Sequence, residues 1–211
     1  MNYIEQYNQY IKSNPDKVCN KVKTIYERLS KEMNQEIKFS VIDSDGNKQE
    51  KVFVFDEKKG ERAIEFIERF CKHSKGKWGG KPIKLELFQK AFLQATYGFV
   101  EKTTRLRRYK KIMLYVARKN GKSTLASGIS LFQLYKDGEH GAEVVSCAVK
   151  REQAKIVHDE AVKMINKSPA LRSRTRCLTT GVFYDEMESK MSALGMGLSK
   201  ASKRAMAAWG F

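Results

Sequence analysis

Apolar and polar residues alternate along the first third of the chain in patterns that predict two amphipathic helices, a β-hairpin and a third helix. Pro15 separates the first two helices, because proline is poorly tolerated inside a helix. The turn of the hairpin falls at residues 43–46, which end in a glycine. The predicted elements cover residues 3–11, 22–33, 37–55 and 63–71.

A basic, glycine-rich segment at residues 72–82 separates this region from the rest of the chain. It places Trp78 among lysines and glycines, so it suits contact with DNA as well as it suits an exposed linker. We therefore expect two domains. Residues 1–75 would form an N-terminal helical region with a short β-hairpin, and residues 76–211 would form the main domain.

The pattern after this segment predicts an α/β fold. A continuous apolar run at residues 112–117 has the length and composition of a strand buried in a parallel sheet, and a second run covers residues 144–149. Helical stripes precede, separate and follow the two strands, which predicts a parallel sheet covered by helices on both faces. These stripes cover residues 85–95, 125–132 and 154–165.

The charge of the chain favours a polyanionic partner. The 41 lysines and arginines exceed the 24 aspartates and glutamates, which gives a formal net charge of +17. Such an excess favours a phosphate backbone, although a solvated basic surface has the same composition. The densest cluster precedes the first predicted strand and is our candidate DNA contact, with a subunit contact or a solvated surface as alternatives. Its members are Arg105, Arg107, Arg108, Lys110 and Lys111.

The remaining composition bears on where the protein resides in the cell and on whether it binds zinc. No stretch has the length and apolarity of a membrane span, and the polar N-terminus lacks the apolar centre of a secretory signal. We therefore expect a cytoplasmic protein without a membrane partner. The four cysteines and three histidines lack zinc-ligand spacing, so we expect the cysteines to be buried free thiols.

Residues 118–124, which follow the first predicted strand, have the composition of a phosphate-binding loop. Where a strand leads into a helix, consecutive backbone N–H groups and the helix dipole attract phosphate. In such a loop Gly121 gives clearance, Lys122 reaches the β- and γ-phosphates, and Ser123 ligates Mg²⁺. The full GxxxxGK[ST] motif is not met, because Val116 replaces its first glycine. We predict a P-loop NTPase-type fold that binds ATP and Mg²⁺.

Residues 118–124 resemble the deviant Walker A motif of tailed-phage terminase large subunits. That family often lacks the first glycine and carries an arginine three residues before the Gly-Lys pair, where this chain has Arg118. Other segments resemble the family in the same order, so that the resemblance extends over about residues 1–195. These segments are 55–67, 75–82, 85–89, 107–108 and 148–154.

The resemblance implies roles for individual residues. Arg118 and Lys122 would be the catalytic cations, with Arg118 sensing the γ-phosphate and Ser123 ligating Mg²⁺. Phe88 and Gln89 would frame the adenine, although Phe88 also fits the apolar stripe of its helix. Arg118 and Lys119 could equally be surface cations. The implied phosphate-contacting residues are Arg118, Lys119, Asn120, Gly121, Lys122, Ser123 and Thr124.

The resemblance also implies a DNA-packaging motor whose partners are duplex DNA, a small terminase subunit, a portal ring and further copies of the chain. The sequence departs from the family after residue 195, and it lacks the coupling motif and the nuclease domain. Asp185 and Glu186 offer a weak Walker B candidate. We expect the ATP-binding portion of the motor, incomplete for turnover. The alternative is a non-catalytic DNA- or motor-binding module that retains the P-loop fold.

Overall fold

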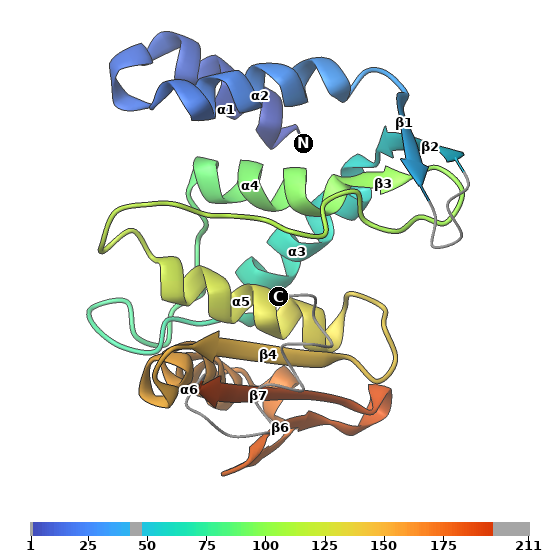
Figure 1. The fold of residues 1–211 in the computed structure, drawn as a ribbon. Coiled ribbons are helices and arrows are strands. Elements are labelled where there is room, and N and C mark those ends of the chain that lie inside the picture. Colours follow the sequence, from blue (N-terminus) through green and yellow to red (C-terminus); the bar gives the residue numbers. More distant parts are fainter. Residues whose placement is uncertain (1, 43–47, 196–211) are drawn as a thin grey trace. The chain divides into compact units, whose positions relative to one another are not determined.

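The computed structural model describes residues 2–42 and 48–195, and Figure 1 shows the order of their elements. The predicted turn at residues 43–46 and the C-terminal residues 196–211 lie outside the described residues. The helices are α1 (Tyr3–Ser13), α2 (Asn20–Glu32), α3 (Glu57–Phe70), α4 (Leu87–Gly98), α5 (Lys122–Tyr135), α6 (Arg151–Lys167) and α7 (Pro169–Arg172), with 3₁₀ turns η1 (Pro15–Lys17) and η2 (Asp185–Met187). The strands are β1 (Ile37–Ile42), β2 (Lys48–Phe55), β3 (Phe99–Glu101), β4 (Glu143–Ala148), β5 (Arg176–Leu178), β6 (Gly181–Tyr184) and β7 (Ser189–Gly195).

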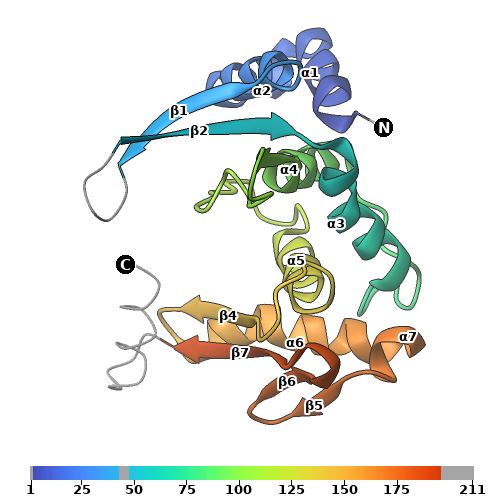
Figure 2. The same ribbon diagram turned by 90° about the vertical axis from the view of Figure 1, so that its right-hand side faces the viewer.

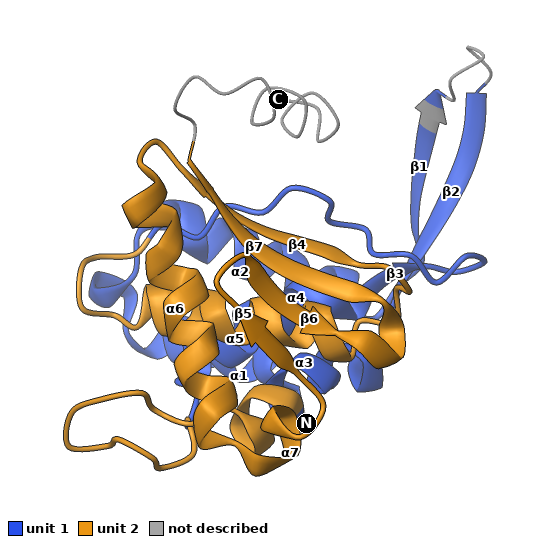
Figure 3. Ribbon diagram, turned by 90° about the horizontal axis from the view of Figure 1, so that it is seen from below, with its two compact units in different colours: residues 1–65, 84–115 blue, residues 66–83, 116–211 orange. Residues whose placement is uncertain are grey.

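The chain forms two compact units, which are coloured separately in Figure 3. Unit 1 combines residues 1–65 with 84–115, and unit 2 combines residues 66–83 with 116–211. The sequence suggests a single boundary after residue 75, and the units divide the chain differently. The reason is that the chain returns to unit 1 after residue 83, where β3 pairs with β2.

Unit 1 buries the apolar faces of α1, α2 and α4 against one another. Its core contains Ile4, Ile11 and Leu29, together with Phe99 at the start of β3. The amphipathic helices predicted at 3–11 and 22–33 are confirmed, as is the break at Pro15. Burial of their apolar stripes stabilises helices of this length, which are marginal in isolation.

A buried glutamine of α4 caps α1. Gln94 Oε1 accepts hydrogen bonds from the backbone N–H of Tyr3 at 2.7 Å and of Ile4 at 3.0 Å. These groups belong to the first turn of α1, where a helix has no acceptors of its own. The contact joins residues 90 positions apart, and no local sequence pattern indicates it.

The sheet of unit 1 is antiparallel, in the order β1-β2-β3. Figure 2 shows β1 and β2 as a long two-stranded ribbon, which confirms the two predicted strands of the hairpin. Phe55 of β2 lies opposite Phe99 of β3, so the sheet is continuous with the helical core.

An arginine–glutamate pair connects the ribbon to the helices of unit 1. Arg108 Nη1 lies 2.6 Å from Glu32 Oε2, and the two side chains are only 9% and 13% exposed. The Arg108 guanidinium also lies over the rings of Phe39, Phe99 and Tyr109, at 4.9 to 5.6 Å from their centroids. This residue therefore joins α2, β1 and β3 through one charged and three aromatic contacts.

Unit 2 contains a mixed sheet in the order β4-β7-β6-β5. Only β4 and β7 are parallel, and the other neighbouring pairs are antiparallel. The helices α5 and α6 pack against each other and both contact β4 and β7, so they cover the same face of the sheet. The α/β class and the helix-flanked sheet are confirmed, whereas the expectation of a parallel sheet with helices on both faces gives way to a mixed sheet with α5 and α6 on one face.

The predicted strand at residues 112–117 is wrong. Within the described residues this segment belongs to no sheet, and the side chains of Met113 and Tyr115 are 87% and 95% exposed. A strand needs a neighbouring chain to accept and donate its backbone hydrogen bonds, and an apolar run does not specify that neighbour. The apolar run at residues 112–117 is therefore real, but it does not pair with a neighbouring strand in the described part of the chain.

The cysteines are free, as predicted, but only Cys71 is buried. Burial raises the pKa of the Cys71 thiol to about 12, so it stays protonated and acts as an apolar side chain. The expectation of burial is wrong for Cys19, Cys147 and Cys177, which are exposed. The structure also has no helix among its described residues with the length and apolarity to span a membrane.

We predict that Arg108→Ala lowers the free energy of unfolding by about 2–3 kcal/mol, because Glu32 would keep a largely buried charge without its main partner. The control is Arg28→Ala, whose side chain is 57% exposed and lies 3.7 Å from the same carboxylate. That exposed pair should contribute less than about 1 kcal/mol. Urea denaturation of both variants measures the two free energies of unfolding. Equal losses would contradict a larger contribution from the Arg108–Glu32 pair.

Candidate nucleotide-binding site

Residues 116–121 form the loop that leads into α5, and the loop turns through two residues with left-handed backbone. Lys119 has φ 67° and Gly121 has φ 70°. Gly121 is the N-cap of α5, which begins at Lys122, so the helix predicted from the stripe at residues 125–132 starts inside the predicted loop 118–124. Left-handed residues between right-handed ones aim successive backbone N–H groups in one direction, which is the geometry of an anion-binding concavity.

The N-terminus of α5 has no side-chain cap. Gly121 offers no side chain, and the first helical hydrogen bond runs from Leu125 N to Gly121 O at 2.9 Å. The N–H groups of the first turn therefore have no acceptor within the helix, and the positive end of the helix dipole lies at the same place. The loop residues from 117 to 123 are all exposed, so an anion can reach these groups.

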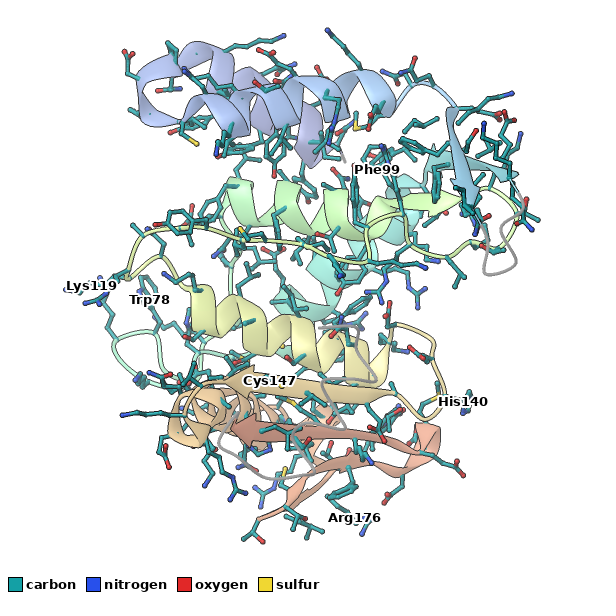
Figure 4. The ribbon with its side chains drawn as sticks, viewed as in Figure 1. Trp78, Phe99, Lys119, His140, Cys147 and Arg176 are labelled. Carbon is teal, nitrogen blue, oxygen red and sulfur yellow. The ribbon has the colours of Figure 1, made fainter. Side chains whose placement is uncertain are left out.

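Lys122 is folded back onto its own loop. Its Nζ donates to Val116 O at 2.8 Å and to Ala117 O at 3.0 Å. Both acceptors are neutral carbonyls, so these two contacts place no negative charge beside the ammonium. Arg118 and Lys119 are exposed beside it, and Figure 4 shows Lys119 projecting outward from unit 2. The loop thus brings together three cations within five residues.

Contacts with α6 and α3 hold the start of α5 in place. Ser127 Oγ donates to Val157 O on α6 at 2.8 Å. At Gly128 an added Cβ would lie only 3.1 Å from the Ile67 side chain, so this glycine allows close packing against α3. Leu131 and Phe132 are buried further along the helix. The loop is therefore attached to a helix with a fixed position in unit 2.

The residues predicted to frame adenine lie in unit 1, at the start of α4. Phe88 is half-buried and Gln89 is buried. Gln89 Oε1 accepts a hydrogen bond from Glu86 N at 3.0 Å, which forms part of a capping box at the helix N-terminus. The oxygen of this amide is therefore engaged locally, and contact of either residue with a base stays a prediction.

Asp185 and Glu186, the candidate Walker B pair, lie at the end of unit 2 opposite to the loop that precedes α5. Arg176 binds Asp185 with two hydrogen bonds of 2.6 and 2.7 Å, which lower the pKa of that carboxyl. Glu186 accepts a hydrogen bond from Tyr184 at 2.6 Å. Both acids follow β6, which is antiparallel to β7, so they lie where β7 begins. Figure 1 shows β4 and β7 pointing to the other end of unit 2, toward the N-terminus of α5.

The basic cluster of unit 1 is divided between packing and exposure. Arg105 pairs with Asp56, Arg107 lies over the ring of Tyr97, and Arg108 is the largely buried partner of Glu32. Lys110 and Lys111 are exposed. The sequence indicates the cluster of charge, but it does not distinguish a structural arginine from a surface lysine.

Sequence reasoning missed the two carbonyl groups, of Val116 and Ala117, that hold Lys122. Backbone acceptors carry no signal in the residue type, so only the path of the chain reveals them. The structure groups no three His, Cys, Asp or Glu side chains in metal-binding range, as far as its described residues go.

Comparison with known proteins identifies the relatives of this chain. Residues 87–194 match the family described as terminase large subunit, ATPase domain. The terminase large subunit of Enterobacteria phage HK97 is 41% identical over 124 residues, which cover 58% of this chain and 23% of that protein. The crystal structure of the HK97 bacteriophage large terminase matches with a TM-score of 0.57 and 34% identity, over 67% of this chain and 28% of that one.

The chain therefore spans about a quarter of the length of these relatives. The match to the family covers more than half of this chain and includes both α4 and the loop that precedes α5. The chain belongs to the terminase large subunit family, and its residues 87–194 correspond to the ATPase domain of that family.

Proposed function

We propose that the chain is the ATP-binding portion of a phage DNA-packaging motor. The observation that carries the proposal is the exposed loop 116–121, which ends at the uncapped N-terminus of α5 with Lys122 beside it. This arrangement suits a triphosphate, because it offers N–H groups without helical acceptors, a helix dipole and an ammonium at one point. The family supports the use of a nucleotide.

Each residue of the loop has a distinct part in this proposal. The backbone N–H groups of residues 121–124 bind the phosphates, and Lys122 leaves its two carbonyl acceptors to contact them. Ser123 Oγ ligates the Mg²⁺ that accompanies ATP, and Arg118 contacts the terminal phosphate. Bound ATP·Mg²⁺ supplies the phosphoryl group and the metal ion that the reaction needs.

The proposed partners follow from the relatives rather than from any contact in the structure. A packaging motor acts on duplex DNA, and a small terminase subunit, a portal ring and further copies of the chain are its proposed protein partners. The alternative function is a non-catalytic DNA- or motor-binding module. One observation favours this alternative: Asp185 and Glu186 lie where β7 begins, at the end of unit 2 opposite to the loop.

Nucleotide binding should depend on Lys122. We expect Lys122→Ala to weaken binding of a fluorescent ATP analogue in the presence of Mg²⁺ by about tenfold or more, which corresponds to about 1.4 kcal/mol or more. Lys163→Ala is the matched control, because it removes an exposed lysine of α6 in the same unit. Identical affinities of the two variants would rule out a phosphate site at this loop.

Turnover should be slow and independent of the acidic pair. We expect purified chain to hydrolyse ATP at a low rate that neither Asp185→Asn nor Glu186→Gln changes, because these acids are engaged by Arg176 and Tyr184 away from the loop. The same preparation should not nick plasmid DNA with Mg²⁺ or Mn²⁺, because two-metal cleavage needs several clustered carboxylates. Rapid hydrolysis that Glu186→Gln abolishes would overturn this assignment.

Duplex DNA binding should be non-specific and should weaken steeply with salt, because basic side chains release counterions from the phosphates. Reversing the two exposed lysines, as Lys110→Glu with Lys111→Glu, should weaken binding more than the same charge change at Lys12 and Lys17, which are exposed on α1 and η1. Fluorescence anisotropy at several salt concentrations measures both pairs. Equal losses would mean that only the net charge matters and that the cluster is not a specific contact surface.

A further inference from the structure

Residues 72–82 of unit 2, here called the Trp78 turn, are held by their own backbone hydrogen bonds. His73 N donates to Lys81 O at 2.9 Å, and Gly80 N donates to His73 O at 2.8 Å. At the tip, Lys81 N donates to Trp78 O at 2.9 Å and Gly79 N donates to Gly76 O at 2.9 Å. The segment is therefore a defined turn and not an extended linker.

The Trp78 turn is fixed to the body of unit 2. Its two ends meet at the buried residues Cys71 and Ile83, whose backbones are joined by a 3.0 Å hydrogen bond. Ser74 Oγ donates to the carboxylate of Glu160 on α6, with distances of 2.6 and 2.7 Å to its two oxygens. The orientation of the turn within unit 2 is thus set by the core and by α6.

This anchored turn presents one large aromatic ring among cations. Trp78 is 52% exposed, and Figure 4 labels its position. The Nζ atoms of Lys77 and Lys81 lie 5.2 and 5.0 Å from the centre of its ring. Lys72 and Lys75 belong to the same turn, and no acidic residue occurs between residues 72 and 83. Four lysines therefore outnumber Glu160, the carboxylate that Ser74 contacts, and the surface is positive as well as aromatic.

Two glycines of the turn, two residues before and two residues after Trp78, have open space beside them. Gly76 and Gly80 have φ of 75° and 82°, and a Cβ placed at either would meet no atom within 4 Å. The indole is a flat aromatic surface on which a nucleic-acid base can stack. An exposed ring on a rigid, basic and open turn is therefore suited to a ligand that is both anionic and aromatic.

We propose that the Trp78 turn binds DNA at unpaired bases, with one base stacked on the indole of Trp78 and the adjoining phosphates paired with Lys77 and Lys81. A base can displace an ammonium from the ring, because base stacking on an aromatic side chain is stronger than an exposed cation–π contact. The displaced ammonium then has a phosphate as its partner. Bases inside an intact duplex offer no free face, so the site selects single-stranded or frayed DNA.

The inference rests on the proposed role in DNA packaging, but it concerns a surface separate in sequence from the nucleotide loop. Tryptophan fluorescence tests it directly, because Trp78 and Trp209 are the two tryptophans of the chain. In a Trp209→Phe background, we expect a single-stranded oligothymidylate to quench the emission of Trp78. A blunt duplex of the same number of phosphates should quench it far less.

Affinity measurements complete the test. Trp78→Ala should weaken binding of the single strand by about tenfold, and Trp78→Phe should retain most of the affinity. Replacing both Lys77 and Lys81 by glutamine should reduce the slope of log K against log salt by about 1.4, as expected for two phosphates. Tyr10→Ala, at another exposed aromatic residue, is the control and should change nothing. Thermal unfolding checks that each variant is folded.

The outcomes separate this inference from the proposed function. If folded Trp78→Ala binds the single strand like the unchanged chain, or if blunt duplex quenches equally, the inference is overturned. ATP binding is measured on the same samples and should be unaffected by Trp78→Ala. Loss of single-strand binding together with intact ATP binding supports both proposals. A chain that binds DNA through Trp78 but binds no ATP would refute the proposed function alone.

Discussion

The packing of α5 against α6 and one face of the sheet is the constraint on which the candidate site depends. An anion-binding helix terminus is useful only if the helix cannot move away from its ligand. Ser127 fixes one turn of α5 to α6, and Gly128 lets Ile67 approach closely. The exposed loop residues therefore lie at the end of a helix whose residues 124–135 are buried or half-buried.

Lys122 has carbonyl partners in this structure and would have phosphate partners in the proposed complex. Its ammonium now contacts the carbonyls of Val116 and Ala117, which are neutral acceptors. A phosphate oxygen is a stronger acceptor because charge-assisted hydrogen bonds exceed neutral ones. In the proposed function, a phosphate replaces these carbonyls as the partner of Lys122.

Arginine ion pairs differ in burial between the two units, and they therefore differ in their contribution to stability. Arg108 is nearly buried, where one carboxylate and three rings satisfy it, and it contributes to the packing of unit 1. Arg176 pairs with Asp185 on the surface of unit 2, and this exposed pair contributes little stability. The lysines around Trp78 have aromatic partners instead of carboxylates. A net charge of +17 therefore describes composition and not one binding surface.

The sequence by itself determined the amphipathic helices, the two strands of the hairpin and the presence of a loop that leads into α5. These features depend on residue spacing and on local backbone preferences, which are written in neighbouring residues. Only the tertiary structure decided that residues 112–117 have no strand partner, that Gln94 caps α1, and that Asp185 follows an antiparallel strand. Each of these depends on which distant segment supplies a hydrogen bond, and a local pattern of hydrophobicity cannot specify that partner.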